Sequence, residues 1–303
     1  MPKAGRAPKY EIDVTLFEDL VGKEVVQFIC EFAPRKVATR FEKALDHFNK
    51  AAKLDGFDDE MGAIRLIAAE EELVVAIFEI LKLRADCFPK HRDFVRRFKN
   101  HQVKLAFYPV LSQFRFAVKD YFVHGVTFEG WEDILHWHPR LVVSGNRIML
   151  QIRDNEGKEI ATNDPLCANI SMDDLDEDAV IDELHKDLSS TIRDQHRLSV
   201  REFISQRADY RNKLLYAQDD GFMLMNETLR ELTTIFNQVF HDLLWVLAIL
   251  LGSTPPSKDW GLVSQFISLY RRVLATSGVL KVALDRPGVA LQEARCTTEG
   301  GGG

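Results

Sequence analysis

Apolar residues recur every three or four positions along most of this chain, which is the period of an amphipathic α-helix. In the first half, two such patterns lie between residues 11 and 54 and are split near Pro34, and a third covers residues 61–84. A fourth helix is expected to open at Pro89 and to run to about residue 121. Pro109 lies inside it and should kink or divide it.

The pattern changes to alternation between residues 141 and 160, which favours strands over helices. Two turn sequences, Ser144-Gly145-Asn146 and Asn155-Glu156-Gly157, divide this stretch at positions typical of hairpins. Residues 125–170 are therefore predicted to hold a small antiparallel β-hairpin or meander.

Helical periodicity returns after the insertion. An acidic start at residues 173–178 opens a pattern that reaches Gln218, either whole or broken once. Gly221 separates it from a long apolar helix over residues 222–251, and a last helix covers about residues 258–276. The predicted fold class is therefore mainly α, a helical bundle with a small β-insertion.

Composition is that of an ordinary folded protein. The 303 residues are 46% hydrophobic and 28% charged, with a formal net charge of −7. This balance argues against nucleic-acid binding over the whole surface but leaves a local basic groove open. The expected divisions are residues 1–10 as disordered, 11–124 as one helical half, 125–170 as the insertion, 171–284 as a second helical half packed on the first, and 285–303 as a flexible Gly-rich tail.

Nothing in the sequence indicates export or a membrane partner. Residues 1–10 are basic but lack the apolar stretch of a signal peptide. The most apolar run, residues 243–252, is far shorter than the ~20 residues that a bilayer requires. The four cysteines share no C-x-x-C spacing, so neither disulfides nor a zinc knuckle are predicted. We therefore expect a cytoplasmic protein.

One carboxylate falls on an apolar helix face. Glu71 lies on the stripe of the third helix, whereas its neighbours Glu70 and Glu72 are expected to point away from it. The stripe consists of Ile64, Ile67, Val74, Phe78 and Leu81. An unpaired buried charge is very costly. Either Glu71 reaches solvent at the margin of the stripe, or it pairs with a buried arginine, for which Arg211 is the best candidate.

Residues 90–104 form a strongly basic segment, with six lysines or arginines against one acid. As a helix it would turn Phe94 and Phe98 inward and would place His101 and Lys104 on one face. Such a strip could attract phosphate, or it could be an ordinary solvated helix face. The candidate phosphate-binding residues are His91, Arg96, Arg97, His101 and Lys104, together with Lys213 further along the chain.

The densest polar cluster, Arg211-Asn212-Lys213 followed by Tyr216, lies just before a helix-stop signal in an otherwise apolar pattern. It resembles the signature of the HEPN superfamily, helical-bundle proteins many of which are ribonucleases in toxin and antiviral systems. That signature is an arginine, often followed by asparagine, then a histidine after four to six intervening residues. Tyr216 stands where the family has its histidine. The glutamates 70–72 in an apolar helix, and His101-x-x-Lys104 before an apolar stretch, also look like the helices that accompany this motif, so the resemblance covers about residues 60–120 and 195–250.

The resemblance implies metal-independent RNA cleavage by the 2′-hydroxyl, without a cofactor. Arg211 would hold the charge of the phosphorane, Asn212 would orient a phosphate oxygen, and Glu71 would orient Arg211. Tyr216 is a poor base at neutral pH, but it could donate a proton or stack on a base. His91 or His101 could supply the missing imidazole. The resemblance also implies a homodimer and an antitoxin or defence partner.

Two other functions stay open. The chain could be a non-catalytic interaction protein in which Arg211, Glu71 and Tyr216 form a structural network. A metal-dependent hydrolase around His136 and His138 is more distant, because no third ligand is visible, and no metal site is predicted. Phosphate-loop, nucleophile-elbow and dinucleotide motifs are absent from the sequence, which disfavours those enzyme classes.

Overall fold

The computed structural model describes residues 13–87, 89–92, 94–96, 100–124, 140–153, 156–163, 170, 175–216, 225, 227–252 and 260–280. Within these ranges the protein is a helical bundle with one small antiparallel sheet, which confirms the predicted fold class. The helices are α1 (Thr15–Val21), α2 (Lys23–Phe32), α3 (Arg35–Ala52), α4 (Asp59–Leu83), α5 (His101–Leu105), α6 (Phe107–His124), α7 (Glu177–His196), α8 (Val200–Leu215), α9 (Leu229–Gly252) and α10 (Gly261–Thr276). The strands are β1 (Arg140–Ser144), β2 (Arg147–Arg153) and β3 (Glu159–Asn163).

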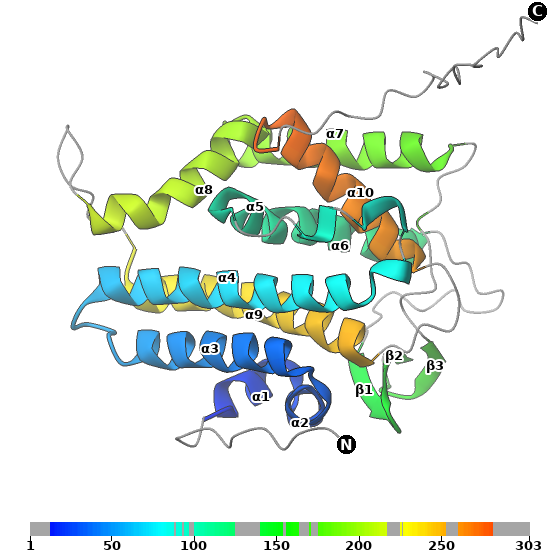
Figure 1. Ribbon diagram of the computed structural model, residues 1–303, viewed down its shortest axis with the longest axis horizontal. Helices are drawn as coiled ribbons and strands as arrows, with labels where there is room; N and C mark the ends of the chain where they lie inside the picture. Colours follow the sequence, from blue (N-terminus) through cyan, green and yellow to red (C-terminus); the bar gives the residue numbers. More distant parts are fainter. Residues whose placement is uncertain are drawn as a thin grey trace, which may run out of the picture.

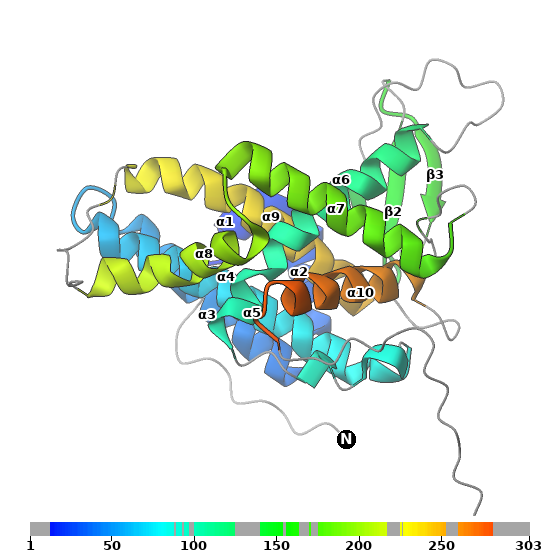
Figure 2. The same ribbon diagram turned by 90° about the horizontal axis from the view of Figure 1, so that it is seen from above.

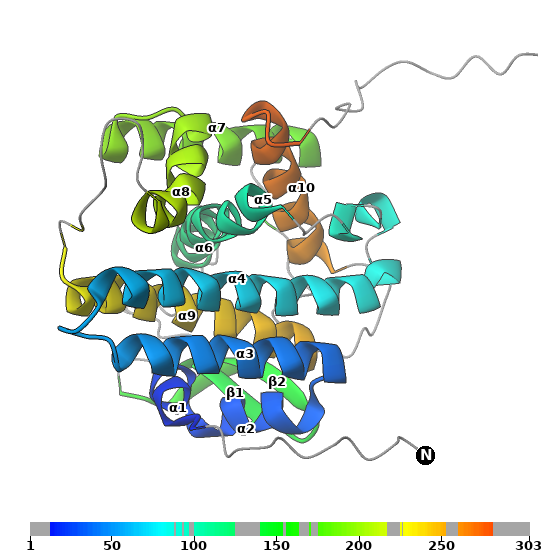
Figure 3. The same cartoon turned by 60° about the vertical axis from the view of Figure 1, so that its left-hand side comes forward.

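Helices α4 and α9 form a central layer (Figures 1 and 3). On one side of this layer lie α1, α2 and α3, and on the other side lie α5, α6, α7, α8 and α10. Seen from above, α7 and α10 run beside each other (Figure 2), and His185 of α7 contacts Thr276 of α10 at 3.0 Å. The central layer thus takes α4 from residues 11–124 and α9 from residues 171–284, and it lies between the two outer layers of helices.

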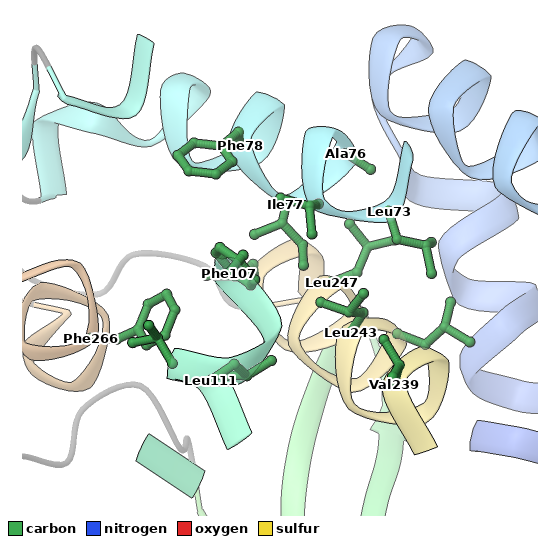
Figure 4. Packing of buried hydrophobic residues seen from close by; sticks show 14 of the residues in the cluster. Leu73, Ala76, Ile77, Phe78, Phe107, Leu111, Val239, Leu243, Leu247 and Phe266 are labelled. Atoms are coloured by element: carbon green, nitrogen blue, oxygen red, sulfur yellow. The ribbon is translucent and has the colours of Figure 1, made fainter. Parts of the chain in front are cut away.

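Apolar side chains of α4, α6, α9 and α10 fill the space around the central layer (Figure 4). Leu73 of α4 and Leu243 and Leu247 of α9 are fully buried. Burying one such side chain stabilises the fold by roughly 1.5–3 kcal/mol relative to leaving it in water. This core fixes α4, and with it Glu70 and Glu71, between the two outer layers of helices.

Two glycines, Gly62 of α4 and Gly252 of α9, allow close packing at the two ends of α9. A Cβ atom on Gly62 would lie 2.2 Å from Leu229 Cδ2, so the first turns of α4 and α9 meet closely there. A Cβ atom on Gly252 would lie 2.5 Å from both the backbone nitrogen and Cγ1 of Ile148 in β2. Glycine at these positions lets α9 pack against α4 at its start and against the sheet at its end.

The sheet has the order β1-β2-β3, with both pairs antiparallel. Gly145 and Asn146 form the turn between β1 and β2, and Gly145 has a φ of +59°, a conformation that glycine adopts without strain. Leu141 and Ile148 are buried against the helices. The predicted β-meander is confirmed, and all its strands fall inside residues 125–170.

The predicted helix from Pro89 to about residue 121 is wrong at its start, whereas the division expected near Pro109 is present. Three short 3₁₀ turns, η1 (Ala85–Cys87), η2 (Pro89–His91) and η3 (Phe94–Arg96), connect α4 to α5, and α5 is separated from α6 at Ala106. Phe94 is buried against Phe78 and Tyr270, at ring distances of 6.4 and 5.6 Å. Tertiary contacts of this kind override a helical pattern in the sequence.

The break that the pattern allowed in the stretch up to Gln218 lies at Arg197, which takes a φ of +59°, and Ser199 with Glu202 forms a capping box that opens α8. Two helix boundaries were misplaced, however. Helix α8 ends at Leu215 rather than at Gln218. Helix α9 begins at Leu229 rather than at residue 222. Thr228 and Glu231 bond each other's backbone N–H groups in the same way, and this caps α9.

Among the described helices, α9 is the one that is long and apolar enough to span a membrane, with a mean hydropathy of 1.6 over its most apolar window. However, 61% of that window is buried inside the protein. Asp242, which is 3% exposed, lies in this helix and is held by side chains of α6. These contacts are those of a central core helix.

Candidate functional site

Helices α4, α5 and α8 meet at a small open cleft of about 130 Å³. The cleft is lined by Glu71, His101, Gln102, Ala208, Asp209, Arg211 and Asn212. Sites that enclose a small organic molecule usually measure ~300–1,000 Å³. A cleft of this size instead suits a single group, such as one phosphate of a longer ligand that lies across the surface.

Glu71 is 7% exposed and is bound by two residues of α5. Its Oε1 accepts a hydrogen bond from Nδ1 of His101 at 2.7 Å, and its Oε2 accepts one from Nζ of Lys104 at 2.5 Å. The three-residue spacing of these donors places both on the face of α5 that meets α4. Both alternatives predicted for Glu71 are wrong. Its carboxylate does not reach solvent at the edge of the apolar stripe, and its partners do not include Arg211.

Contrary to the prediction from the apolar stripe, Glu70 points into the core. It is 0% exposed, and both of its carboxylate oxygens accept from Nη2 of Arg207 at 2.7 Å. Burial raises the pKa of Glu70, and the nearby Arg207 guanidinium opposes this shift. The single-stripe interpretation failed because α4 is covered on several sides, so neighbouring positions are buried together.

Arg211 and Asn212 reach the cleft from the last turn of α8. Arg211 is half-buried, and its Nε is buried without a hydrogen-bond partner within the ranges that the structure describes. A buried donor that lacks a partner costs about 1–3 kcal/mol. Because Arg211 lines the cleft and its planar side chain is always charged, it is the residue of the cleft best suited to bind phosphate.

Tyr216 is not among the residues that line the cleft. Helix α8 ends at Leu215, and Tyr216 follows it in an extended conformation, with the residue 63% exposed. A continued helix would have carried Tyr216 along the same face as Asn212. Lys213 is exposed on α8 and also lies outside the lining. The Arg-Asn half of the motif therefore reaches the cleft, and the tyrosine does not.

His91 lies elsewhere, in a buried contact with α10. Its Nε2 is 3.3 and 3.2 Å from the hydroxyls of Ser264 and Ser268, and its Nδ1 is 3.2 Å from Nη1 of Arg271. Because a guanidinium only donates, Nδ1 must accept, and the ring is neutral with its proton on Nε2. Burial, and then Arg271, lower the pKa of His91 to about 4. The predicted phosphate contact is therefore contradicted, since the imidazole is enclosed and occupied.

Several predicted residues fall outside the described part of the chain. These are the side chain of Arg96, all of Arg97, and His136 and His138. Among the described residues, no group of three or more His, Cys, Asp or Glu side chains could hold a metal ion.

The sequence pattern did not single out a second polar cluster, which surrounds Asp242. Asp242 accepts from Tyr108 at 3.3 Å, from Arg115 at 3.0 Å, from Gln238 at 2.9 Å and from His241 at 3.2 Å. Burial and the nearby Asp242 carboxylate raise the pKa of Tyr108 to about 12. An acid inside an apolar helix was the available signal, the same signal that singled out Glu71.

Comparisons with family models, with curated proteins and with solved structures find no match for this chain. Its function is therefore inferred from the residues of the cleft.

Proposed function

We propose that this chain acts on RNA as a metal-independent endoribonuclease, with His101, Arg211 and Asn212 around the scissile phosphate. The observation that carries the proposal is that an accessible imidazole and a half-buried arginine line the same cleft. The His101 side chain is 56% exposed, so a ligand can reach it. The resemblance of Arg211-Asn212 to the HEPN signature supports the same chemistry.

The contact between Glu71 and His101 prepares the imidazole for proton transfer. Because the carboxylate accepts from Nδ1, that nitrogen carries the hydrogen, and in the neutral ring Nε2 is left as the base. Carboxylates orient catalytic histidines in the same way in hydrolytic triads. His101 would thus take the part of the family histidine, which Tyr216 does not fill.

The reaction needs only groups that the cleft and the substrate supply. His101 Nε2 removes the proton of the 2′-hydroxyl, and the 2′-oxygen forms a bond to phosphorus. Arg211 and Asn212 donate to the phosphorane oxygens while their negative charge develops. The bond from phosphorus to the 5′-oxygen then breaks, and that oxygen takes up a proton from the imidazolium. The products are a 2′,3′-cyclic phosphate and a 5′-hydroxyl.

A toxin or defence ribonuclease of this kind would be a cytoplasmic homodimer that an antitoxin or another defence protein restrains. Sedimentation of the purified protein over a range of concentrations tests the homodimer, and a dimer would sediment with twice the chain mass.

The alternative is a non-catalytic interaction protein whose polar network only stabilises the bundle. The observation in its favour is that Glu70 and Asp242 are buried and fully paired, as structural networks are. In that case Arg211 and His101 would contribute to stability and not to turnover.

Cleavage of total RNA and of an end-labelled oligonucleotide in EDTA separates the two functions. Arg211→Ala removes the phosphate donor, and His101→Gln keeps a donor to Glu71 but cannot shuttle a proton. Arg201→Ala is the matched control, since Arg201 is an exposed arginine on the same helix. We expect each of the first two variants to lose about 100-fold or more in rate with unchanged melting temperature. An inactive wild type would refute the ribonuclease.

A further inference from the structure

Arg207 of α8 contacts three other helices of the bundle beside the cleft. Its Nη2 donates to both oxygens of Glu70 on α4, and its Nε donates to the backbone carbonyl of Leu105 on α5 at 3.1 Å. Its guanidinium carbon lies 6.0 Å from the ring centre of Tyr108 on α6. We refer to Glu70, Arg207 and the Leu105 carbonyl as the arginine clamp.

The Leu105 carbonyl is available to Arg207 because of Pro109. In a continuous helix, the backbone N–H four residues later would donate to this carbonyl, but proline has none. Arg207 supplies the missing donor through a side chain that has α4 at its other end. A lysine could not make both contacts at once, because its ammonium is a single point and not a planar fork.

The arginine clamp lies next to the contact that holds the imidazole. Glu71 follows Glu70 on α4, and His101 lies one helical turn before Leu105 on α5. A helix as short as α5 cannot hold its own conformation in water, so its place depends on tertiary ties. Lys104 provides one tie to Glu71, and the arginine clamp provides a second to the backbone itself.

We infer that Arg207 is a positioning residue for His101. With Glu70 it fixes the backbone of α5 against α4, so that Glu71 accepts from Nδ1 of His101 and Nε2 stays free as the base. The inference deepens the proposed function and rests on it for any effect on catalysis. The tautomer of His101, however, can be measured whether or not the chain cleaves RNA.

The tautomer is measured on the full chain by nitrogen-15 NMR of labelled histidine, at a pH where the ring is neutral, with the signals assigned through His101→Gln. We expect the wild-type ring to be protonated on Nδ1. Arg207→Lys should move it toward the Nε2-protonated tautomer while the fold stays intact. Pro109→Ala restores a backbone donor that competes for the Leu105 carbonyl, so it should act in the same direction without altering Arg207.

Arg40→Lys is the matched control, because Arg40 pairs with Glu72 at 2.9 Å, on the other side of Glu71 and from α3. It should leave the tautomer unchanged. If Arg207→Lys melts like the wild type and keeps Nδ1 protonated, the inference is overturned. If Arg207→Lys does not fold, Pro109→Ala decides in the same terms.

Kinetics provide the link to function. If the wild type cleaves RNA, Arg207→Lys should lower kcat by up to about 100-fold with KM unchanged, as displacement of a reacting group does. A changed KM with unchanged kcat would contradict positioning. A tautomer change in a protein that does not cleave RNA would leave the positioning role standing and would refute the ribonuclease.

Discussion

The carboxylate of Glu71 accepts a hydrogen bond from Nδ1 of His101 at 2.7 Å, and this contact joins α4 to α5 where the cleft begins. The same carboxylate also holds Lys104, whose side chain is largely buried. Glu71 therefore serves two purposes, since it orients the exposed imidazole and it neutralises a lysine that has little access to water.

Glu71→Gln should destabilise the fold, because it leaves Lys104 as a nearly buried charge without a counter-ion. We expect the free energy of unfolding to fall by about 3 kcal/mol, the lower end of the range for breaking a buried pair. Urea unfolding measures it. Glu72→Gln is the control, since its pair with Arg40 is partly exposed and should contribute less than about 1 kcal/mol. Equal losses in the two variants would contradict the difference in burial.

The sequence was sufficient for the fold class, and it singled out four residues that line the cleft, Glu71, His101, Arg211 and Asn212. Periodicity located α3, α4 and α10 and the β-meander, because each has a strong local pattern and clear turn residues. The charge of Glu71 on an apolar face singled out one residue that lines the cleft. The sequence pattern could not identify the partners of Glu71. These partners lie on α5, and the position of α5 depends on contacts with residues far away in the sequence.

The errors in the site share this cause. His91 looked like part of a basic surface strip, but it is enclosed by Ser264, Ser268 and Arg271, about 170 to 180 positions later. Glu70 looked solvent-facing because only one face of α4 was considered apolar. Tyr216 was expected inside a helix that reaches Gln218, but α8 ends at Leu215. Local patterns do not contain long-range packing of this kind.

His91 should make the stability of the protein depend on pH. In the folded state its pKa is about 4, below its ordinary value of 6.5, so the unfolded chain binds the proton more readily between these values. The contribution of neutral His91 to the free energy of unfolding is therefore fully present above about pH 6.5, and it is lost as the pH falls toward 4. The loss should reach about 2–3 kcal/mol by pH 4.5.

The measurement is urea unfolding of the wild type and of His91→Gln at pH 7 and at pH 4.5. The variant removes the titrating group, so the difference between the two pH values should be smaller in it by that amount. His196→Gln, at an exposed histidine, should show the wild-type difference. An equal pH dependence in His91→Gln and the wild type would rule out this role for His91.

Gly252→Ala should cost more stability than Gly62→Ala. At Gly252 the new Cβ would collide with the backbone of Ile148, which cannot move without shifting β2, whereas at Gly62 it would meet only the end of the Leu229 side chain. We expect a loss of about 1–3 kcal/mol for Gly252→Ala. Thermal melts of both variants give the order, and a lower melting temperature for Gly62→Ala would reverse our ranking.

Tyr216→His restores the residue of the family signature, and it tests which side chain the cleft uses. Because α8 ends before Tyr216 and the residue lies outside the cleft, a histidine there should change the rate of RNA cleavage by no more than about twofold. His101→Gln should abolish cleavage in both the wild-type and the Tyr216→His background, because the base is removed in each. Cleavage that survives in the double variant but not in His101→Gln alone would show that position 216 can reach the phosphate. That result would move the catalytic imidazole from α5 to the end of α8.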